Sequence, residues 1–379
     1  MAIDNKDKKV LNVPHLRFPE FTEEWEKYKL SEICSFFSGG TPSSSKKEYY
    51  DGNIPFIRSG ELHEEQTELF ITEDGFKNSA AKMVEVGDLL LALYGATSGD
   101  IAISKINGAI NQAILCIRTE QNKKFIESIW RKHVGKLLQT YLQGGQGNLS
   151  ADIVKNISFY FSRIEEQNKL AEFVSLLDER IATQNKIIED LKKLKSAISL
   201  NVLHSDTWEQ FKIKDIAKIG RGRVISSIEI SQQKNPTYPV YSSQTSNNGI
   251  MGYLDDYMFE GEHISWTTDG ANAGTVFYRN GKFNCTNVCG LLKFRKEFDT
   301  YFVSLVLAEA TKKYVSINLA NPKLMNNTMG NIQIRLPKLE EQKRISIVFR
   351  ELQKLWTVHN SLLTKYTKQK QYLLSQMFI

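Results

Sequence analysis

The chain has 379 residues, with 49 Lys and Arg against 43 Asp and Glu, so its formal net charge is +6. With four cysteines, no N-terminal hydrophobic segment and no apolar run near the roughly 18 residues of a membrane span, the sequence excludes a disulfide scaffold and a membrane protein. We therefore expect a cytoplasmic protein of two or three domains that is an enzyme, a nucleic-acid binder or a scaffold.

The positive charge lies in the second half of the chain. Residues 1–204 hold 26 basic and 28 acidic side chains, whereas residues 205–379 hold 23 and 15. A basic half suits contacts to phosphate groups. Net charge also serves solubility, so charge alone does not identify a partner.

The first globular part follows a flexible tail of residues 1–15 and covers residues 16–163. Apolar runs that begin at Leu89 and Gln112, each bounded by glycine turns, predict strands. A helix is predicted at Phe125–Leu142. This mixture indicates an α+β domain.

A long helix is predicted for residues 164–204, and its apolar residues recur with alternating spacings of four and three. This spacing is typical of a coiled-coil seam. The seam consists of Leu170, Val174, Leu177, Ile181, Ile188, Leu191 and Ile198.

A second globular part covers residues 205–337, with strands predicted at Thr275–Tyr278 and Gly290–Phe294 and a helix at Tyr301–Ser316. Residues 338–379 form a second long helix. Its seam consists of Ile345, Phe349, Leu352, Trp356, Leu363, Tyr366 and Leu373. The alternative is that each helix is an ordinary amphipathic helix packed on its own domain.

The chain contains an internal repeat. Residues 149–202 align without a gap with residues 324–377 at an offset of 175, as do Gly95–Gly99 and Gly270–Gly274. Trp25 matches Trp208 at an offset of 183. The period is far longer than the roughly 20–50 residues of a solenoid repeat, so it indicates a duplicated domain.

Connectivity predicts how the two copies are arranged. Only residues 203–207 separate the first helix from Trp208, so the second helix must run back along the first. We expect two similar recognition domains at opposite ends of an intramolecular antiparallel coiled coil, related by a pseudo-twofold axis. A coiled coil of roughly 55–60 Å suits the reading of two DNA half-sites, since one duplex turn is roughly 34–36 Å.

Several short segments carry a family resemblance. They are Leu16-Arg-Phe-Pro-Glu-Phe with Trp25, Ser38-Gly-Gly-Thr-Pro, Asn53-Ile-Pro-Phe-Ile-Arg-Ser-Gly-Glu-Leu, Gly87-Asp-Leu-Leu, Asn111-Gln-Ala-Ile and the Glu-Glu-Gln triplet before each long helix. In this order, and with the two-copy organisation, the chain resembles the specificity (S) subunit of type I restriction–modification systems over nearly its whole length. The second copy departs from the pattern, with Gly220-Arg-Gly-Arg and Tyr238-Pro-Val-Tyr in place of the Gly-Thr-Pro and Pro-Phe-Ile segments.

The resemblance implies a function and a set of partners. Each domain would read one half of a bipartite, asymmetric double-stranded DNA target, and the helices would fix the spacing and bind two modification (methyltransferase) subunits. Two restriction subunits would add translocation and cleavage. S-adenosylmethionine, ATP and Mg²⁺ are expected on those partners, with no cofactor or metal on this chain.

The sequence gives little support for chemistry on the chain itself. Asn235-Pro-Thr-Tyr238 resembles the Asn-Pro-Pro-Tyr motif of amino-methyltransferases but lacks its second proline, and we interpret it as a turn before a strand. Cys285 and Cys289 have no partner pair at zinc-site spacing and are expected in the core. We therefore expect no catalytic residues. A stand-alone DNA methyltransferase and a protein scaffold without a DNA role stay as alternatives.

Polar and basic loop residues are the candidate DNA contacts, because their side chains can reach base edges or phosphates. In the first copy they are Thr41, Ser43, Lys46, Lys47, Arg58, Tyr94, Thr97, Ser98, Gln143, Gln146 and Asn148. In the second copy they are Arg221, Arg223, Ser243, Gln244, Asn247, Asn248, Thr268, Asn272, Asn318, Asn321 and Lys323. The alternative for each is a solvated turn residue.

Overall fold

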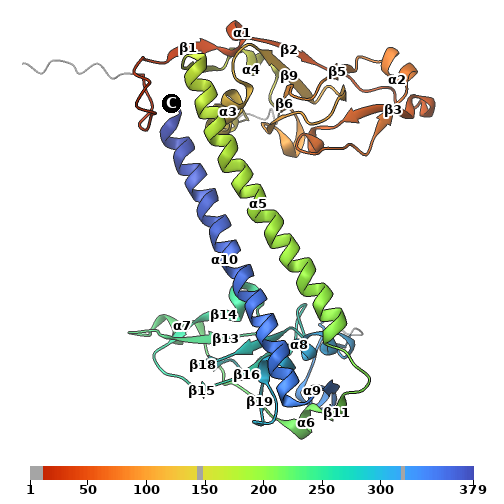
Figure 1. Cartoon of the computed structure of the whole chain (residues 1–379), viewed down its shortest axis with the longest axis vertical. Helices are drawn as coiled ribbons and strands as arrows, with labels where there is room; N and C mark the ends of the chain where they lie inside the picture. Colours follow the sequence, from red (N-terminus) through yellow and green to blue (C-terminus); the bar gives the residue numbers. More distant parts are fainter. Residues whose placement is uncertain (1–11, 143–147, 317–320) are drawn as a thin grey trace, which may run out of the picture. The chain divides into compact units, whose positions relative to one another are not determined.

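The computed structural model describes residues 12–142, 148–316 and 321–379. The chain divides into unit 1, which comprises Met1–Asn185 and Ser361–Ile379, and unit 2, which comprises Lys186–Asn360. Two helices have 39 residues each, α5 (Ile164–Val202) and α10 (Leu339–Met377) (Figure 1). Each of them is divided between the two units.

Unit 1 is built on two four-stranded sheets and one strand pair. The first sheet has the order β2 (Cys34–Ser38), β9 (Ile114–Thr119), β6 (Leu89–Ala92), β7 (Ile101–Ile103). The second has the order β4 (Phe70–Ile71), β3 (Tyr50–Ile57), β8 (Gly108–Ile110), β5 (Lys82–Val84), and β1 (Glu26–Lys29) pairs with β10 (Ser158–Phe161). The α-helices are α1 (Leu30–Ile33), α2 (Glu73–Lys77), α3 (Lys123–Leu142) and α4 (Ala151–Asn156).

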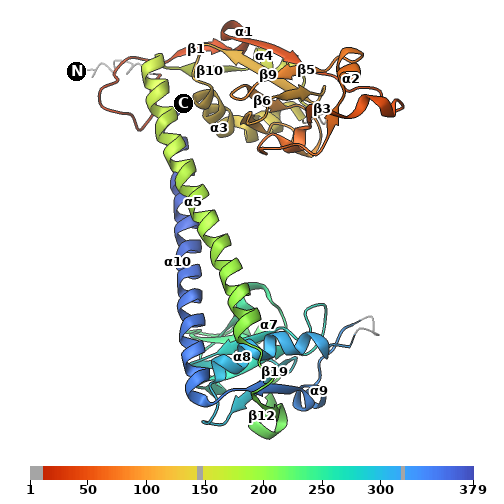
Figure 2. The same ribbon diagram turned by 45° about the vertical axis from the view of Figure 1, so that its right-hand side comes forward.

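Unit 2 repeats this arrangement. Its first sheet has the order β12 (Ala217–Arg221), β19 (Cys289–Phe294), β16 (His263–Thr267), β17 (Val276–Arg279). The second has the order β14 (Ile250–Leu254), β13 (Tyr238–Tyr241), β18 (Lys282–Cys285), β15 (Phe259–Glu260), and β11 (Glu209–Lys212) pairs with β20 (Gln333–Leu336). The α-helices are α6 (Ile213–Ile216), α7 (Ser227–Ser231), α8 (Thr300–Ala310) and α9 (Asn326–Asn331), and α8 packs on the first sheet (Figure 2).

Strand registers confirm the duplication. In unit 1 the central strands pair Leu90 with Cys116, and in unit 2 the residues 175 positions later, Ser265 and Leu291, are paired. The parallel strands β3 and β8 likewise pair in the way that β13 and β18 do. Both copies therefore adopt one α+β fold, as the repeat predicted.

The glutamine of each Glu-Glu-Gln triplet has a defined structural role. Gln167 is fully buried, and its amide accepts a hydrogen bond from the Asn122 N–H (3.2 Å) and donates to the Ser162 carbonyl (2.7 Å). Gln342 makes the equivalent bonds to the Asp299 N–H (2.9 Å) and the Pro337 carbonyl (2.8 Å). Each amide thus ties the start of a long helix to the segment that precedes α3 or α8.

The long helices pair antiparallel within each unit. In unit 1, Leu170 and Val174 at the start of α5 pack with Leu373 and Met377 at the end of α10. In unit 2, Ile198 near the end of α5 packs with Phe349 near the start of α10, and Lys195 Nζ donates to Gln353 Oε1 (3.3 Å). Every predicted seam residue is buried or half-buried.

Most predicted elements are confirmed, with shifted ends. The helix expected at Tyr301–Ser316 ends as an α-helix at Ala310 and continues as a 3₁₀ turn over Thr311–Lys313. Residues 234–237 form the expected turn before β13, where Asn235 N–H donates to the Asp255 carboxylate (2.8 Å). Within the described ranges, no helix is long and apolar enough to cross a membrane.

Candidate nucleic-acid interface

One end of the first sheet in unit 1 gathers several predicted DNA contacts. Leu149 N–H donates to the Leu93 carbonyl (3.0 Å), which places Asn148 beside Tyr94 at the end of β6. Leu93 N–H donates to the Ala113 carbonyl (2.8 Å), and Thr41 Oγ1 donates to Gln112 Oε1 (2.6 Å). Polar side chains from separate loops therefore meet at this end, and we call the set Thr41, Tyr94, Gln112 and Asn148 the unit 1 turn edge.

Unit 2 has the same construction. Leu324 N–H donates to the Thr268 carbonyl (2.8 Å), and Lys323 forms a β-bridge with Asp269. The Arg221 guanidinium donates to the Asn287 carbonyl (3.1 Å) and to Asn326 Oδ1 (3.0 Å). We call the set Arg221, Asp269, Asn287 and Lys323 the unit 2 turn edge.

The two edges share a backbone and differ in chemistry. Leu149 and Leu324 are equivalent by the 175-residue offset, and so are the carbonyl groups that accept from them. At the same offset Tyr94 corresponds to Asp269, Gln112 to Asn287 and Asn148 to Lys323. One scaffold thus presents an aromatic and two amides in unit 1, but an acid, an amide and a base in unit 2.

Some predicted contacts serve the turns themselves. Ser98 Oγ donates to the Leu93 carbonyl (3.0 Å), and Thr268, which is buried, donates to the Val288 carbonyl (2.8 Å). Thr97 ends the 3₁₀ turn Gly95–Thr97. Asn272 and Asn321 are exposed beside the unit 2 turn edge. Asn272 lies in the turn after β16, and Asn321 lies in the segment before Lys323.

A second group of predicted contacts lies before β3. Ser43 Oγ is hydrogen bonded to Ser45 Oγ (2.8 Å), and Lys46 Nζ donates to the Tyr49 hydroxyl (2.9 Å). Lys47 is exposed at the start of the 3₁₀ turn Lys47–Tyr49. These side chains follow Thr41 in the same loop, so the loop extends the polar surface of the turn edge.

Arg58 is held by two carboxylates. Its guanidinium donates to Glu61 (2.6 Å) and to Glu68 (3.1 Å). This pairing occupies the side chain, so a DNA contact by Arg58 would have to replace acidic partners.

The Arg58–Glu61 pair predicts a pH-dependent loss of stability. Burial by itself raises the pKa of Glu61, but hydrogen bonds from Arg58, Thr67 and two backbone N–H groups outweigh it and lower the pKa to about 2. A lowered folded-state pKa stabilises the fold above the ordinary value of 4.5, and this contribution is lost as the pH falls toward 2. A ¹³C NMR titration of the Glu61 carboxyl should show this pKa in the full chain, and Arg58→Gln should raise it.

The turn after β13 holds four predicted residues of unit 2, which are Ser243, Gln244, Asn247 and Asn248. Gln244 Nε2 donates to the Ile250 carbonyl (2.6 Å), which closes the turn. Asn247 and Asn248 adopt positive φ angles of 48° and 52°, a region that costs energy for residues other than glycine. Both side chains are exposed, and Asn247 Nδ2 donates back to the Ile250 carbonyl (3.3 Å). The predicted contact Arg223 is paired with an acid, because its guanidinium donates to the Glu229 carboxylate (2.9 Å).

A buried cation that the sequence did not indicate supports this turn. Arg279 Nε donates to Ser265 Oγ (2.9 Å), and its guanidinium lies 3.6 Å from the ring centroid of Tyr241. Burial lowers its pKa. In unit 1 the residue at the position of Arg279 is the uncharged Ser104, and its neighbours Tyr241 and Ser265 correspond to the apolar Ile57 and Leu90, so the charge is specific to the second copy.

Other edge residues were also missed from sequence. Gln112, Asn287 and Asn326 contribute polar groups to the edges, and only Gln112 had a signal, since it lies in the Asn111-Gln-Ala-Ile segment. Gln143, Gln146 and Asn318 lie outside the described residues.

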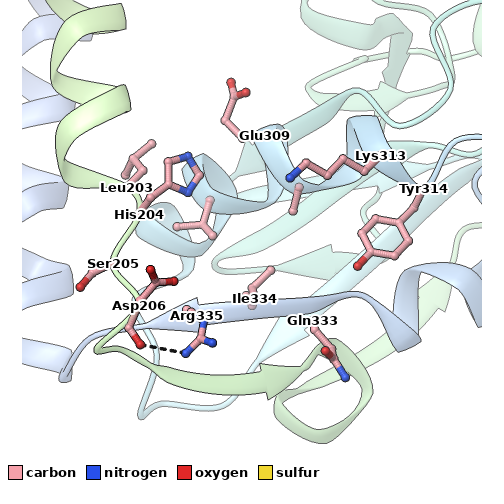
Figure 3. Close-up of a pocket in the computed structure, with 12 residues that line it drawn as sticks. Leu203, His204, Ser205, Asp206, Glu309, Lys313, Tyr314, Gln333, Ile334 and Arg335 are labelled. Atoms are coloured by element: carbon pink, nitrogen blue, oxygen red, sulfur yellow. Dashed lines mark hydrogen bonds between the residues drawn. The ribbon is translucent and has the colours of Figure 1, made fainter.

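A cavity of about 360 Å³ in unit 2 lies beside titratable side chains (Figure 3). His204 and Asp206 line it from the link after α5, and Arg335 lines it from β20. Arg335 Nη1 donates to the carbonyls of Asp206 (3.0 Å) and Trp208 (3.2 Å), so these groups brace the link between α5 and β11.

The described part of the chain contains no cluster of three or more His, Cys, Asp or Glu side chains that could hold a metal ion. Cys285 and Cys289 are buried free thiols, as expected.

The fold and its doubled polar edge define a two-module protein without a metal cluster in the described ranges. A family profile for the type I restriction modification DNA specificity domain matches residues 22–193 and 205–365. Because these matches cover most of the chain and both copies, the protein belongs to this family.

Individual relatives agree with this assignment. A putative type I specificity subunit N-terminus from Mycoplasma pneumoniae is 46% identical over 140 residues, which are 36% of this chain and 74% of the relative. The type I restriction enzyme MpnII specificity subunit of the same organism is 43% identical over 150 residues, covering 39% of this chain and 44% of the relative. The match spans less than two thirds of the length of most of these relatives.

A solved structure shows the same fold over the whole chain. The crystal structure of a type I restriction–modification S subunit from M. genitalium superposes with a TM-score of 0.70, covering 97% of this chain and 99% of that chain at 16% identity. The predicted α+β fold with two recognition-type modules and paired long helices is therefore confirmed.

Proposed function

We propose that the chain is the DNA sequence-recognition subunit of a type I restriction–modification complex. The observation that carries this proposal is the turn edge, which is built twice on the same backbone hydrogen bond with different side chains. A protein that reads an asymmetric bipartite target needs two modules of one shape with different readout groups. Amides such as Gln112 and Asn148 suit adenine, and Lys323 suits guanine or phosphate.

The proposal extends to partners that carry the chemistry. The outer face of α10 in unit 2 exposes Ile347, Val348, Leu355 and Val358, and exposed apolar surface of this kind is typical of protein contacts. We propose that modification subunits dock on the long helices and bind S-adenosylmethionine, and that restriction subunits bind ATP and Mg²⁺. In this assembly the chain supplies specificity and its partners supply catalysis.

Substitutions at one edge should relax one half-site only. In Gln112→Ala the loss of a bidentate amide contact should reduce discrimination at one base pair of the first half-site by about 1–3 kcal/mol. The measurement is methylation of a randomised duplex library by the complex with its modification subunit, followed by sequencing of the modified sites. Gln66→Ala is the matched control, because Gln66 is exposed in the same unit in a loop rich in glutamate, which repels phosphate.

Two outcomes would contradict the proposal. If the parent complex methylates all duplexes alike, the chain does not confer specificity. If Gln112→Ala changes both half-sites equally, or behaves like Gln66→Ala, the unit 1 turn edge does not read bases.

A further inference from the structure

The two copies of the fold differ in what covers the start of their long helix. In unit 1, residues 12–24 form a strap across α5. The Phe18 ring packs edge-on against Phe173, with ring centroids 6.0 Å apart. Lys169 Nζ pairs with Glu20 and lies 4.9 Å from the Phe18 ring centroid, and Leu16 N–H donates to the Gln376 carbonyl (3.0 Å).

A charged pair anchors the strap. The Arg17 guanidinium donates two hydrogen bonds of 2.7 Å to the Glu166 carboxylate, whose side chain is only 2% exposed. Paired N–H···O bonds of this kind are among the strongest side-chain contacts in proteins. The strap therefore binds through an arginine, an aromatic ring and an acid, which are the first, second and fourth residues of Arg17-Phe-Pro-Glu20.

Unit 2 presents the same receiving groups without a strap. By the 175-residue offset, Glu341 corresponds to Glu166, Arg344 to Lys169 and Val348 to Phe173. Residues 203–207 are all that separates α5 from Trp208, so the second copy has no segment equivalent to the strap. Among the described residues, neither the Glu341 carboxylate nor the Arg344 guanidinium has a hydrogen-bond or ion-pair partner.

An open groove occupies this place, which we call the α10 groove. It has a volume of about 530 Å³, its apolar floor is formed by Ile198, Val202, Ile345, Val348 and Phe349, and Glu341 and Arg344 lie on its rim. Val348 is 47% exposed and its neighbour Ile347 61%. Apolar surface with flanking charges that have no partner is suited to a peptide that brings opposite charges and a ring.

We infer that the α10 groove binds a segment of a partner protein in which an arginine is followed by an aromatic residue and, two positions later, by an acid. The arginine pairs with Glu341, the ring covers Val348 and Ile345, and the acid pairs with Arg344. The inference extends the docking part of the proposed function by naming its site and chemistry. It is independent of DNA reading, because the groove lies on the helix pair of unit 2 and not at the turn edge.

The strap itself supplies the probe. A fluorescent peptide with the sequence of residues 12–24 should bind the full chain with a dissociation constant of roughly 0.1–1 mM, weak because a flexible peptide loses conformational freedom. Val348→Glu should weaken binding at least tenfold, since it places a charge in the apolar floor. Val224→Glu is the matched control, because Val224 is an exposed valine of the same unit that does not line the groove, and it should leave binding unchanged.

A charge exchange separates the groove from the occupied site in unit 1. Glu341→Arg should abolish binding of the parent peptide and restore binding of a peptide in which the position of Arg17 is glutamate. Absence of saturable binding, or equal binding by Val348→Glu and Val224→Glu, would overturn the inference. Either result would leave DNA recognition untouched, because no DNA is present in the assay.

Discussion

Replacing Arg17 with alanine is expected to lower the free energy of unfolding of unit 1 by about 3–5 kcal/mol, because it leaves a buried carboxylate without its counter-ion. The Arg17 side chain is 13% exposed and that of Glu166 is 2% exposed. Trp25 Nε1 also donates to Glu166 (3.1 Å), so one carboxylate joins the strap, the first strand segment and α5. Hydrogen exchange in peptides of α3 and β6, followed by mass spectrometry, measures the change in unit 1 alone.

A neighbouring ion pair is the control. Arg163 pairs with Glu23, but their side chains are 73% and 51% exposed, and exposed pairs contribute at most about 1 kcal/mol. Arg163→Ala should therefore have a small effect. The double variant Arg17→Ala with Glu166→Gln should recover part of the stability, because the neutral amide needs no counter-ion and its oxygen still accepts from Trp25. If Arg17→Ala and Arg163→Ala have equal effects, the anchor is not a buried pair.

The sequence predicted the parts of the fold that follow from periodicity. The seam from Leu170 and the repeat at an offset of 175 require only apolar spacing and identity, and both appear in the structure. The Glu-Glu-Gln triplet was visible as a repeated motif, but its glutamine amide accepts a hydrogen bond from the N–H of Asn122 or Asp299, more than 40 residues away. Contacts of that separation leave no periodic trace in a single sequence.

The candidate site was predicted in part, for the same reason. Turn residues such as Tyr94 and Asn148 stand out as polar positions in loops, but Gln112, which lies at the same edge, comes from a third segment. Residue type alone also predicted Thr268 and Ser98 as DNA contacts, whereas their hydroxyl groups donate hydrogen bonds to backbone carbonyl groups of the turns. The repeat could not indicate Arg279, because the equivalent residue of the first copy is Ser104, which carries no charge.

Replacing Gly222 with alanine is expected to disrupt the unit 2 turn edge, whereas the same change at Gly220, two residues away, is expected to be tolerated. A Cβ on Gly222 would overlap the carbonyl group of Cys285 at the end of β18, and a backbone neighbour cannot move aside as a side chain can. A Cβ on Gly220 meets no atom within 4 Å. Overpacking costs typically 1–3 kcal/mol, and we expect about 3 kcal/mol here because backbone must separate from backbone.

The functional consequence of Gly222→Ala should be confined to one half-site. Arg223, the residue after Gly222, forms a β-bridge with Thr286, and its carbonyl accepts a hydrogen bond from the Asn287 N–H (3.0 Å). Displacement of Arg223 therefore disorders the unit 2 turn edge, which contains Asn287. Methylation-site sequencing should show relaxed discrimination in the second half-site and an unchanged first half-site. Gly39→Ala should give the reciprocal result, because Gly39 lies against the Ile110 carbonyl at the equivalent place in unit 1. Equal behaviour of Gly220→Ala and Gly222→Ala would show that close approach of the two backbones does not support the edge.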